Sequence, residues 1–133
     1  MSQENVGLVR GVYDHFSATG TLDLKRLAST FVVDMSNFEI WPEDHFYEGH
    51  DGAKEYLRAW LEPWDTYEHR LEALLDAGDQ VVAILHISAT PRRSGAAVEM
   101  RVGHVWTVID DTLMRVTAYS EPEKALEAAG LSE

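Results

Sequence analysis

The sequence contains no cysteine, and only four prolines and nine glycines occur among its 133 residues. The absence of cysteine excludes disulfide bonds, thiolate metal sites and cysteine nucleophiles, and it is compatible with a reducing compartment. No apolar run approaches the roughly 20 residues of a membrane-spanning helix. The polar start from Met1 to Asn5 lacks the basic and then apolar segments of a secretion signal. We therefore expect a cytoplasmic protein.

Positive charge is also scarce, because 11 Lys and Arg face 23 Asp and Glu, and the formal net charge is -12. A field of this sign repels phosphate backbones and anionic lipid surfaces, so we expect no nucleic acid and no membrane as partner. The hydrophobic share of 45% is typical of a folded chain. The length fits a single domain that covers residues 1–133.

The first half of the chain has mostly helical periodicity. Apolar residues spaced by three and four predict a helix that ends at Gly20 and a shorter one over residues 24–31, with Asp23 as its cap. Residues 35–41 then alternate as a short strand, which Pro42 ends because proline cannot donate to a strand ladder.

A third helix, capped by Asp51, carries an unusual aromatic load. Tyr56, Trp60 and Trp64 fall on one face of it. After this helix the period becomes two, which predicts antiparallel strands over 67–75, 81–90, 98–109 and 113–119. Ser120 and Glu123 have the spacing of a capping box for a last helix that ends at Gly130.

This α+β order requires the helices to cover one face of a curved sheet. Together with four short motifs, it resembles the nuclear transport factor 2-like superfamily, which has the cystatin-like fold, and within it the polyketide-cyclase-like (SnoaL-like) group. The resemblance covers essentially the whole chain. The motifs are Val12-Tyr13-Asp14, Tyr47-Glu48-Gly49-His50-Asp51-Gly52, His104-Val105-Trp106-Thr107 and Ala125-Leu126-Glu127-Ala128-Ala129-Gly130-Leu131.

The resemblance implies a cone-shaped, curved antiparallel sheet covered by the N-terminal helices. The sheet and the helices enclose a pocket, and such proteins are commonly homodimers. Members include steroid isomerases, polyketide cyclases, dehydratases, epoxide hydrolases and proteins that only bind a ligand. The fold therefore leaves the activity open, and individual residues must decide it.

Comparison with the steroid isomerases argues against their mechanism, which needs a carboxylate base and a protonated acid inside the pocket. Tyr13 stands where the isomerase oxyanion-hole tyrosine would stand. Trp41 and Gly103 occupy the two positions where the acids would stand. An ordinary core tyrosine with one hydrogen-bond partner is the simpler interpretation of Tyr13.

Epoxide hydrolases of this fold use two aspartates and an arginine around a water molecule. By the same alignment the inward positions of the last strand hold no acid; they are Val116, Ala118 and Ser120. Alternation along the strand predicts that Glu39 shares the face of Trp41. A Glu39 close to Arg101 or Tyr13 is then the one acid/base arrangement that these residues allow. A salt bridge at the rim of the cone is the simpler interpretation of Glu39.

The six histidines predict no metal site and no cofactor, because none has the helical i, i+4 spacing of zinc-protease ligands. The alignment places His104 on the convex face of the sheet together with Trp106 and Tyr119. There, these three residues are expected to contribute to a homodimer interface.

The aromatic residues give the stronger functional signal. Most should point into the cone, with Trp64 near its mouth; the set is Tyr13, Phe16, Trp41, Tyr56, Trp60 and Trp64. Such a lining suits a flat, small hydrophobic ligand held by stacking, although the rings could instead simply fill the core. Ligand binding is our leading hypothesis. The alternatives are an isomerase, dehydratase or hydrolase that acts on a polyketide- or steroid-like substrate, and a non-catalytic dimeric interaction domain.

Overall fold

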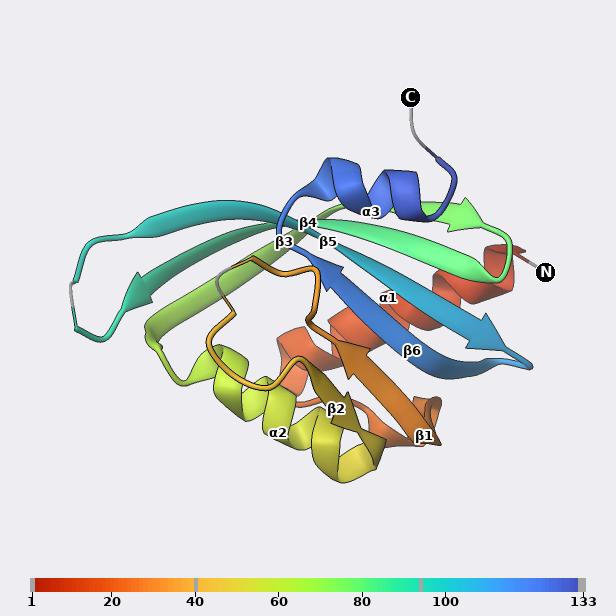
Figure 1. Ribbon diagram of the computed structural model, residues 1–133, viewed down its shortest axis with the longest axis horizontal. Coiled ribbons are helices and arrows are strands. Elements are labelled where there is room, and N and C mark those ends of the chain that lie inside the picture. The colour runs from red at the N-terminus through yellow and green to blue at the C-terminus, as the bar shows by residue number, and fades with distance from the viewer. Residues whose placement is uncertain (1, 40, 94, 132–133) are drawn as a thin grey trace.

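The structure is a computed structural model, and it describes residues 2–39, 41–93 and 95–131. The elements lie in the order that Figure 1 shows. They are α1 (Ser2–Thr19), a single 3-10 turn η1 (Leu24–Arg26), β1 (Leu27–Asp34), β2 (Phe46–Glu48), α2 (Gly49–Leu61), β3 (Trp64–Ala77), β4 (Gln80–Pro91), β5 (Val98–Ile109), β6 (Thr112–Tyr119) and α3 (Pro122–Ala128).

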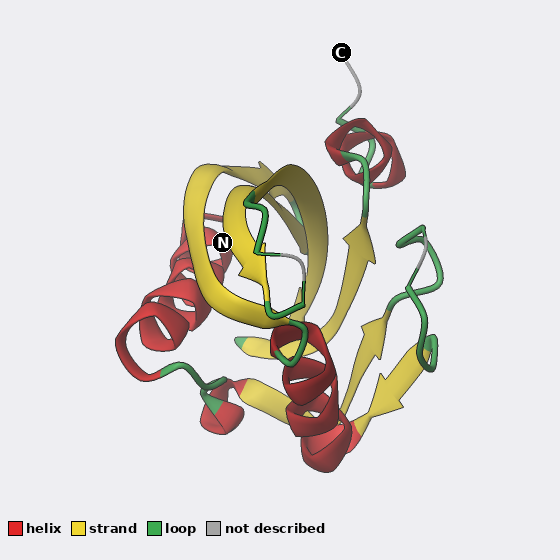
Figure 2. Cartoon of the chain, turned by 90° about the vertical axis from the view of Figure 1, so that its left-hand side faces the viewer, coloured by secondary structure: helices red, strands yellow, loops and turns green. Residues whose placement is uncertain are grey.

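The described strands form one sheet with the order β2-β1-β6-β5-β4-β3. Neighbours are antiparallel except for β1 and β6, which run parallel, with Val33 opposite Val116. The long strands β3 and β4 bend at a register shift between Leu71 and Ala73. Figure 2 shows the result, a sheet curled into an open cone. The predicted α+β class and the cone-shaped sheet are thus confirmed.

The helices divide between the two faces of this sheet. In Figure 1, α2 lies below the sheet and α3 above it, and α1 contacts β3 and β4. Alternation along β4 places Val81, Ala83 and Leu85 in the main core on the concave side. Val82 and Ile84 point the other way, into a smaller cluster under α3. The cone therefore has two separate apolar layers, and the larger one lies between the sheet and α1 and α2.

Gly103 fixes which face of β5 is which. A Cβ atom on Gly103 would lie 2.6 Å from the Cβ of Ala125 in α3, so this residue faces the convex side. The prediction that Gly103 points into the cone is therefore wrong. His104 and Trp106 consequently point to the concave side, and the prediction that they lie on the convex face is wrong too. Tyr119 does lie on the convex side, beside the cluster under α3.

Two of the predicted elements are also wrong. Residues 24–31 are not a helix, because they form the turn η1 and then the first part of β1. The prediction failed because apolar side chains four residues apart share one face of a helix and also one face of a strand. The chain leaves the sheet after Asp34, and the backbone N–H groups of Phe38 and Trp41 donate to the carbonyls three residues earlier, so the described residues among 35–41 are not a strand. Ile40 of that predicted strand lies outside the described residues.

The predicted caps have mixed outcomes. Asp23 accepts a hydrogen bond from the backbone of η1, as expected of a cap. The helix α2 instead begins after Glu48, and α3 begins after Glu121, in neither case with a side-chain cap. Among residues 2–39, 41–93 and 95–131, no helix is long and apolar enough to cross a membrane.

Candidate functional site

A cavity of about 70 Å³ lies between α1, α2 and the concave face of the sheet. None of the described residues that line it is Asp, Glu, Lys or Arg. The lining residues are Val12, Tyr13, Phe16, Leu22, Phe31, Val33, Tyr56, Leu57, Trp60, Tyr67, His69, Leu85, His104, Trp106, Val116 and Ala118. The surplus of acidic residues therefore lies outside the described cavity wall, whose titratable groups are two histidines and three tyrosines.

A hydrogen-bonded chain of three residues forms the polar part of the cavity. The Nε1–H of Trp106 donates to the hydroxyl oxygen of Tyr13 over 2.8 Å, and this hydroxyl lies 2.6 Å from Nδ1 of His104. The rings of Tyr13 and His104 are nearly parallel, at 6°, while Trp106 meets Tyr13 edge-on. Tyr13 comes from α1, and the other two residues are two positions apart on β5, so they share its concave face.

This geometry favours one placement of the protons. Since the Tyr13 oxygen already accepts from Trp106, its own hydrogen needs an acceptor, and Nδ1 of His104 is the one that the described residues supply. Neutral His104 then carries its proton on Nε2. Burial lowers the pKa of His104 to about 4, with a further lowering from His69, and burial raises the pKa of Tyr13 well above its ordinary value. Both groups are therefore neutral at pH 7.

Two further tyrosines add neutral hydroxyl groups to the wall. Trp60 of α2 donates through Nε1 to the hydroxyl of Tyr67 on β3 over 2.9 Å. Burial raises the pKa of Tyr67 to about 12, and the pKa of Tyr56 also rises because of its burial. The cavity thus contains no phenolate at physiological pH.

His69 of β3 lies at the boundary between the cavity and the surface. Its ring centroid is 5.3 Å from that of Phe16 and 6.1 Å from that of Tyr13, and its Nε2 is 3.4 Å from the hydroxyl of Ser17. Partial burial lowers the pKa of His69, so this imidazole is also neutral at pH 7. With His69 and His104 both uncharged, the described wall carries no net charge.

Thin walls separate the cavity from two surface grooves. Leu22 and Leu57 line both the cavity and an apolar groove between α2 and the segment after α1. Phe16, Tyr67 and His69 line both the cavity and a second, more polar groove. Rotation of one of these side chains would therefore join the cavity to the surface.

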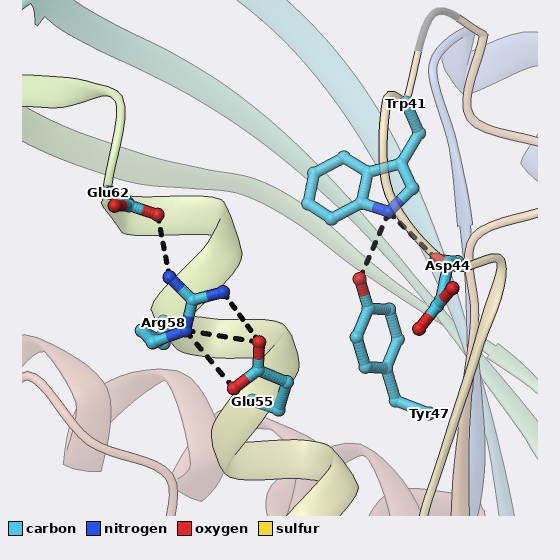
Figure 3. Close-up of polar contacts among 6 residues, drawn as sticks. All are labelled: Trp41, Asp44, Tyr47, Glu55, Arg58 and Glu62. Carbon is cyan, nitrogen blue, oxygen red and sulfur yellow. Dashed lines mark hydrogen bonds and ion pairs between the residues drawn. The ribbon is translucent and has the colours of Figure 1, made fainter.

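The predicted aromatic set is split by the structure. Tyr13, Phe16, Tyr56 and Trp60 line the cavity. Trp41 stands one layer behind and stacks on Trp60, with centroids 5.9 Å apart and planes at 26°. Its Nε1 donates to the backbone oxygen of Asp44 and to the hydroxyl of Tyr47, which Figure 3 shows on the right.

Trp64, expected near the mouth, is absent from the described lining. It starts β3 and packs on the outside of the main core, and its buried Nε1 has no partner among the described residues. On the exposed side of α2, Arg58 forms ion pairs with Glu55 and Glu62, also drawn in Figure 3.

The three candidate catalytic residues are not brought together. Glu39 is exposed and lines a polar groove beside α3, where its backbone N–H donates to Ser120. Arg101 points to the convex side and pairs with Glu72 at 2.9 Å. Tyr13 is buried inside the cone. The acid/base arrangement expected from Glu39, Arg101 and Tyr13 therefore does not form.

The inward positions expected for β6 are partly right. Val116 and Ala118 line the cavity, whereas Ser120 follows the strand and lines the polar groove with Glu39. Sequence reasoning missed Tyr67 and His69 as cavity residues. Their alternation with Leu71 in a predicted strand was a usable signal, since all three share one strand face.

Comparison with known proteins supports one family and one fold. The model of the SnoaL-like domain family matches residues 9–116. No curated protein matches the sequence. Among solved structures, a putative SnoaL-like polyketide cyclase from Jannaschia sp. CCS1 has a TM-score of 0.73 and 17% identity, with 89% of this chain and 85% of that one covered.

Two further structures are similar over nearly their whole lengths. A protein of unknown function from Burkholderia pseudomallei K96243, described as nuclear transport factor 2-like, has a TM-score of 0.74 and 16% identity, with 93% and 95% coverage. The protein TerC, co-crystallised with polyporic acid, has a TM-score of 0.73 and 16% identity, with 96% and 98% coverage. At these identities the similarity shows the fold.

Proposed function

The chain belongs to the SnoaL-like domain family, and from this premise we propose that it binds a small, uncharged, flat hydrophobic or aromatic molecule in its cavity. The family and its fold point to ligand binding or a polyketide-cyclase-like role. The observation that carries the proposal is the wall itself, which combines aromatic rings with polar groups that are all neutral at pH 7. Such a wall favours stacking and penalises a charged ligand, because a charge would lose its hydration without gaining a partner.

The cavity volume sets a condition on this binding. An engineered cavity of about 150 Å³ in another protein accepts benzene, whereas the cavity here holds about 70 Å³. An aromatic ligand must therefore push aside part of the wall. Leu22 and Leu57 are the side chains that separate the cavity from the apolar groove, so we propose entry between them.

Titration with the neutral fluorophore N-phenyl-1-naphthylamine tests the proposal. We expect its fluorescence to rise on binding and this rise to be lost in Ala118→Leu, whose added atoms fill the cavity from β6. The matched control is Ala128→Leu, the same change on the exposed end of α3. Absence of a signal in the wild type, or an equal signal in both variants, would contradict the proposal.

One observation favours catalysis as a second candidate function. The hydroxyl of Tyr13 and the imidazole of His104 form a buried hydrogen-bonded pair at the cavity wall, and both group types can act in general acid–base steps. A polyketide- or steroid-like ketone is the class of substrate that an isomerase, dehydratase or hydrolase would take here. We expect His104→Gln to abolish turnover of such a compound. An unchanged rate in this variant would show that the pair of Tyr13 and His104 is not catalytic.

We also propose cytoplasmic location and a homodimer through the convex sheet face. Of the three interface residues first expected, the structure leaves Tyr119 on that face, because His104 and Trp106 line the cavity. Such a dimer with a vestigial cavity would be the non-catalytic alternative. Sedimentation velocity at micromolar concentration tests the assembly, and a monomer alone at all concentrations would rule it out.

A further inference from the structure

Several polar groups of the cavity wall have no hydrogen-bond acceptor among the described residues. The Nε1–H groups of Trp60 and Trp106 donate hydrogen bonds to the hydroxyl oxygens of Tyr67 and Tyr13. No described residue accepts a hydrogen bond from the hydroxyl of Tyr56, from the hydroxyl of Tyr67 or from Nε2 of His104. The described wall offers no carboxylate that could accept a hydrogen bond from these groups. The wall is therefore complementary to a ligand that brings an acceptor atom.

His104 differs from the tyrosines, because its free nitrogen can only donate. Nδ1 is occupied by the Tyr13 hydroxyl, whose oxygen is held in turn by Trp106. A neutral imidazole has one N–H, which this chain of bonds assigns to Nε2. A tyrosine hydroxyl can rotate and can accept as well as donate, so it tolerates a ligand hydroxyl or a carbonyl equally. His104 tolerates an acceptor alone.

From this geometry we propose that Nε2–H of His104 donates to an oxygen acceptor of the ligand, so that the site selects neutral aromatic carbonyl compounds over the matching hydrocarbons. Tyr13 is the positioning residue, because its hydroxyl holds the imidazole in the donating tautomer. This inference rests on the proposed ligand binding in the cavity, and it adds the chemical class of the ligand. Stacking provides affinity for any flat ring, while His104 distinguishes among rings by their substituents.

Three probes of nearly equal size test the proposal: acetophenone, 1-phenylethanol and ethylbenzene. A neutral hydrogen bond in a buried site should make acetophenone bind about threefold to tenfold more tightly than ethylbenzene in calorimetric titrations. The infrared carbonyl stretch of bound acetophenone should move to lower wavenumber. Equal affinity of all three would overturn the inference and leave the proposed function standing, whereas no binding of any probe would overturn both.

Variants identify which donor is responsible. The preference for acetophenone should disappear in His104→Leu and remain at least in part in His104→Gln, whose amide can both accept from Tyr13 and donate. Tyr13→Phe should reduce the preference without weakening ethylbenzene binding, because the tautomer of His104 is then no longer fixed. Tyr56→Phe tests the competing donor of the same wall, and Tyr119→Phe, which lies outside the cavity, is the matched control. Loss of the preference in Tyr56→Phe and its persistence in His104→Leu would contradict the assignment to His104.

The wild-type protein provides a readout that does not depend on a variant folding. With ¹⁵N-labelled histidine, the Nε2 resonance of His104 should be that of a protonated nitrogen at pH 7. Acetophenone should shift this resonance more than ethylbenzene does. A protonated Nδ1 in His104 would contradict the proposal directly.

Discussion

At the residue scale, the hydroxyl of Tyr13 is the most connected polar atom of the cavity. It accepts from Trp106 and, in the arrangement favoured above, donates to Nδ1 of His104; Tyr13 and Trp106 are buried and His104 is partly buried. Removal of this one oxygen leaves a buried donor and a buried acceptor unpaired. The cost of such a change exceeds that of an ordinary hydrogen bond, because the lost partner cannot be replaced by solvent.

We predict that Tyr13→Phe lowers the free energy of unfolding by about 1–3 kcal/mol. Urea denaturation followed by tryptophan fluorescence measures this change. Tyr119→Phe is the control, since this half-exposed tyrosine on the convex side uses its hydroxyl in none of the side-chain hydrogen bonds found among the described residues. A similar decrease in the free energy of unfolding in both variants would show that the buried hydrogen bonds of Tyr13 do not stabilise the fold more than an ordinary surface hydroxyl does.

The depressed pKa of His104 predicts the pH dependence of stability. The group titrates near 6.5 in the unfolded chain and near 4 in the fold, so the unfolded state binds more protons between these values. Stability is therefore fully present above pH 6.5 and decreases as the pH falls toward 4, by up to about 3 kcal/mol. His69, whose pKa is lowered as well, acts in the same direction.

Denaturation curves at half-unit steps from pH 7.5 to 4.5 check this dependence. His104→Gln should flatten the slope by nearly one proton, because it removes the titrating group. Tyr119→Phe is the control and should leave the slope unchanged, because the pKa of this hydroxyl is raised above 10.0 by burial and lies outside this pH range. A slope that stays the same in His104→Gln would mean that the imidazole binds protons in the fold as it does in the unfolded chain.

The site residues were predictable where a pattern was long and regular. Tyr13, Tyr56 and Trp60 follow from helical periodicity, because both helices are amphipathic and their apolar faces must lie against the sheet. His104 and Trp106 were assigned to the wrong face, since β5 is buried on both sides along its middle and its alternation carries little contrast. The close approach of Gly103 to α3 decides the face, and nothing in the sequence indicates it.

At the element scale, α3 depends on one glycine. Gly103 lets the helix approach the sheet so closely that a Cβ atom would lie 2.6 Å from Ala125 and 3.4 Å from Pro122. We predict that Gly103→Ala destabilises the protein by about 1–3 kcal/mol by pushing α3 away from β4 and β5. The double variant with Ala125→Gly should recover part of the loss.

Gly7→Ala is the matched control, because its added Cβ meets nothing within 4 Å on α1. We expect it to be neutral or stabilising, since alanine favours helix more than glycine does. Thermal unfolding of the four proteins separates the effects. Equal Tm values for Gly103→Ala and the wild type would show that α3 adjusts its position without cost.

The segment after α1 shows why an element type can be misread. Leu27 and Phe31 are four residues apart and both are buried, which fits a helix face and equally an even number of strand steps. Ser29, Thr30 and Val32 around them favour the extended form, because β-branched and small polar side chains disfavour helix. The parallel neighbour β6 then decides the outcome, and this long-range partner is invisible to any local pattern.

At the scale of the whole molecule, the net charge of -12 acts on stability. The acidic side chains outnumber Lys and Arg by twelve, and most ion pairs among the described residues, such as Arg58 with Glu55, lie at the surface, although Arg115 pairs with the buried Asp34. Mutual repulsion therefore opposes the compact state, and salt screens it.

We predict that raising NaCl from 10 mM to 300 mM at pH 7.5 increases Tm by a few degrees. The same comparison near pH 4.8, close to the isoelectric point of the sequence, is the control, because the net charge there is small. Calorimetric scans measure both. An equal gain at both pH values would point to a general salt effect and not to charge repulsion.

The position of β1 in the sheet has a consequence for how the protein is made. Val32 in β1 pairs with Arg115 in β6, 83 positions later in the chain, and the described partners of β1 are β6 and the short strand β2. At about 5–20 residues per second, a ribosome needs roughly 4–17 s to synthesise the intervening segment. During that interval the nascent β1 has an exposed edge on its β6 side, and β1 with α2 is not yet joined to the part of the sheet formed by β3, β4 and β5. The cone can close only after translation of β6, so its nascent chain is a natural client for chaperones that bind exposed apolar segments.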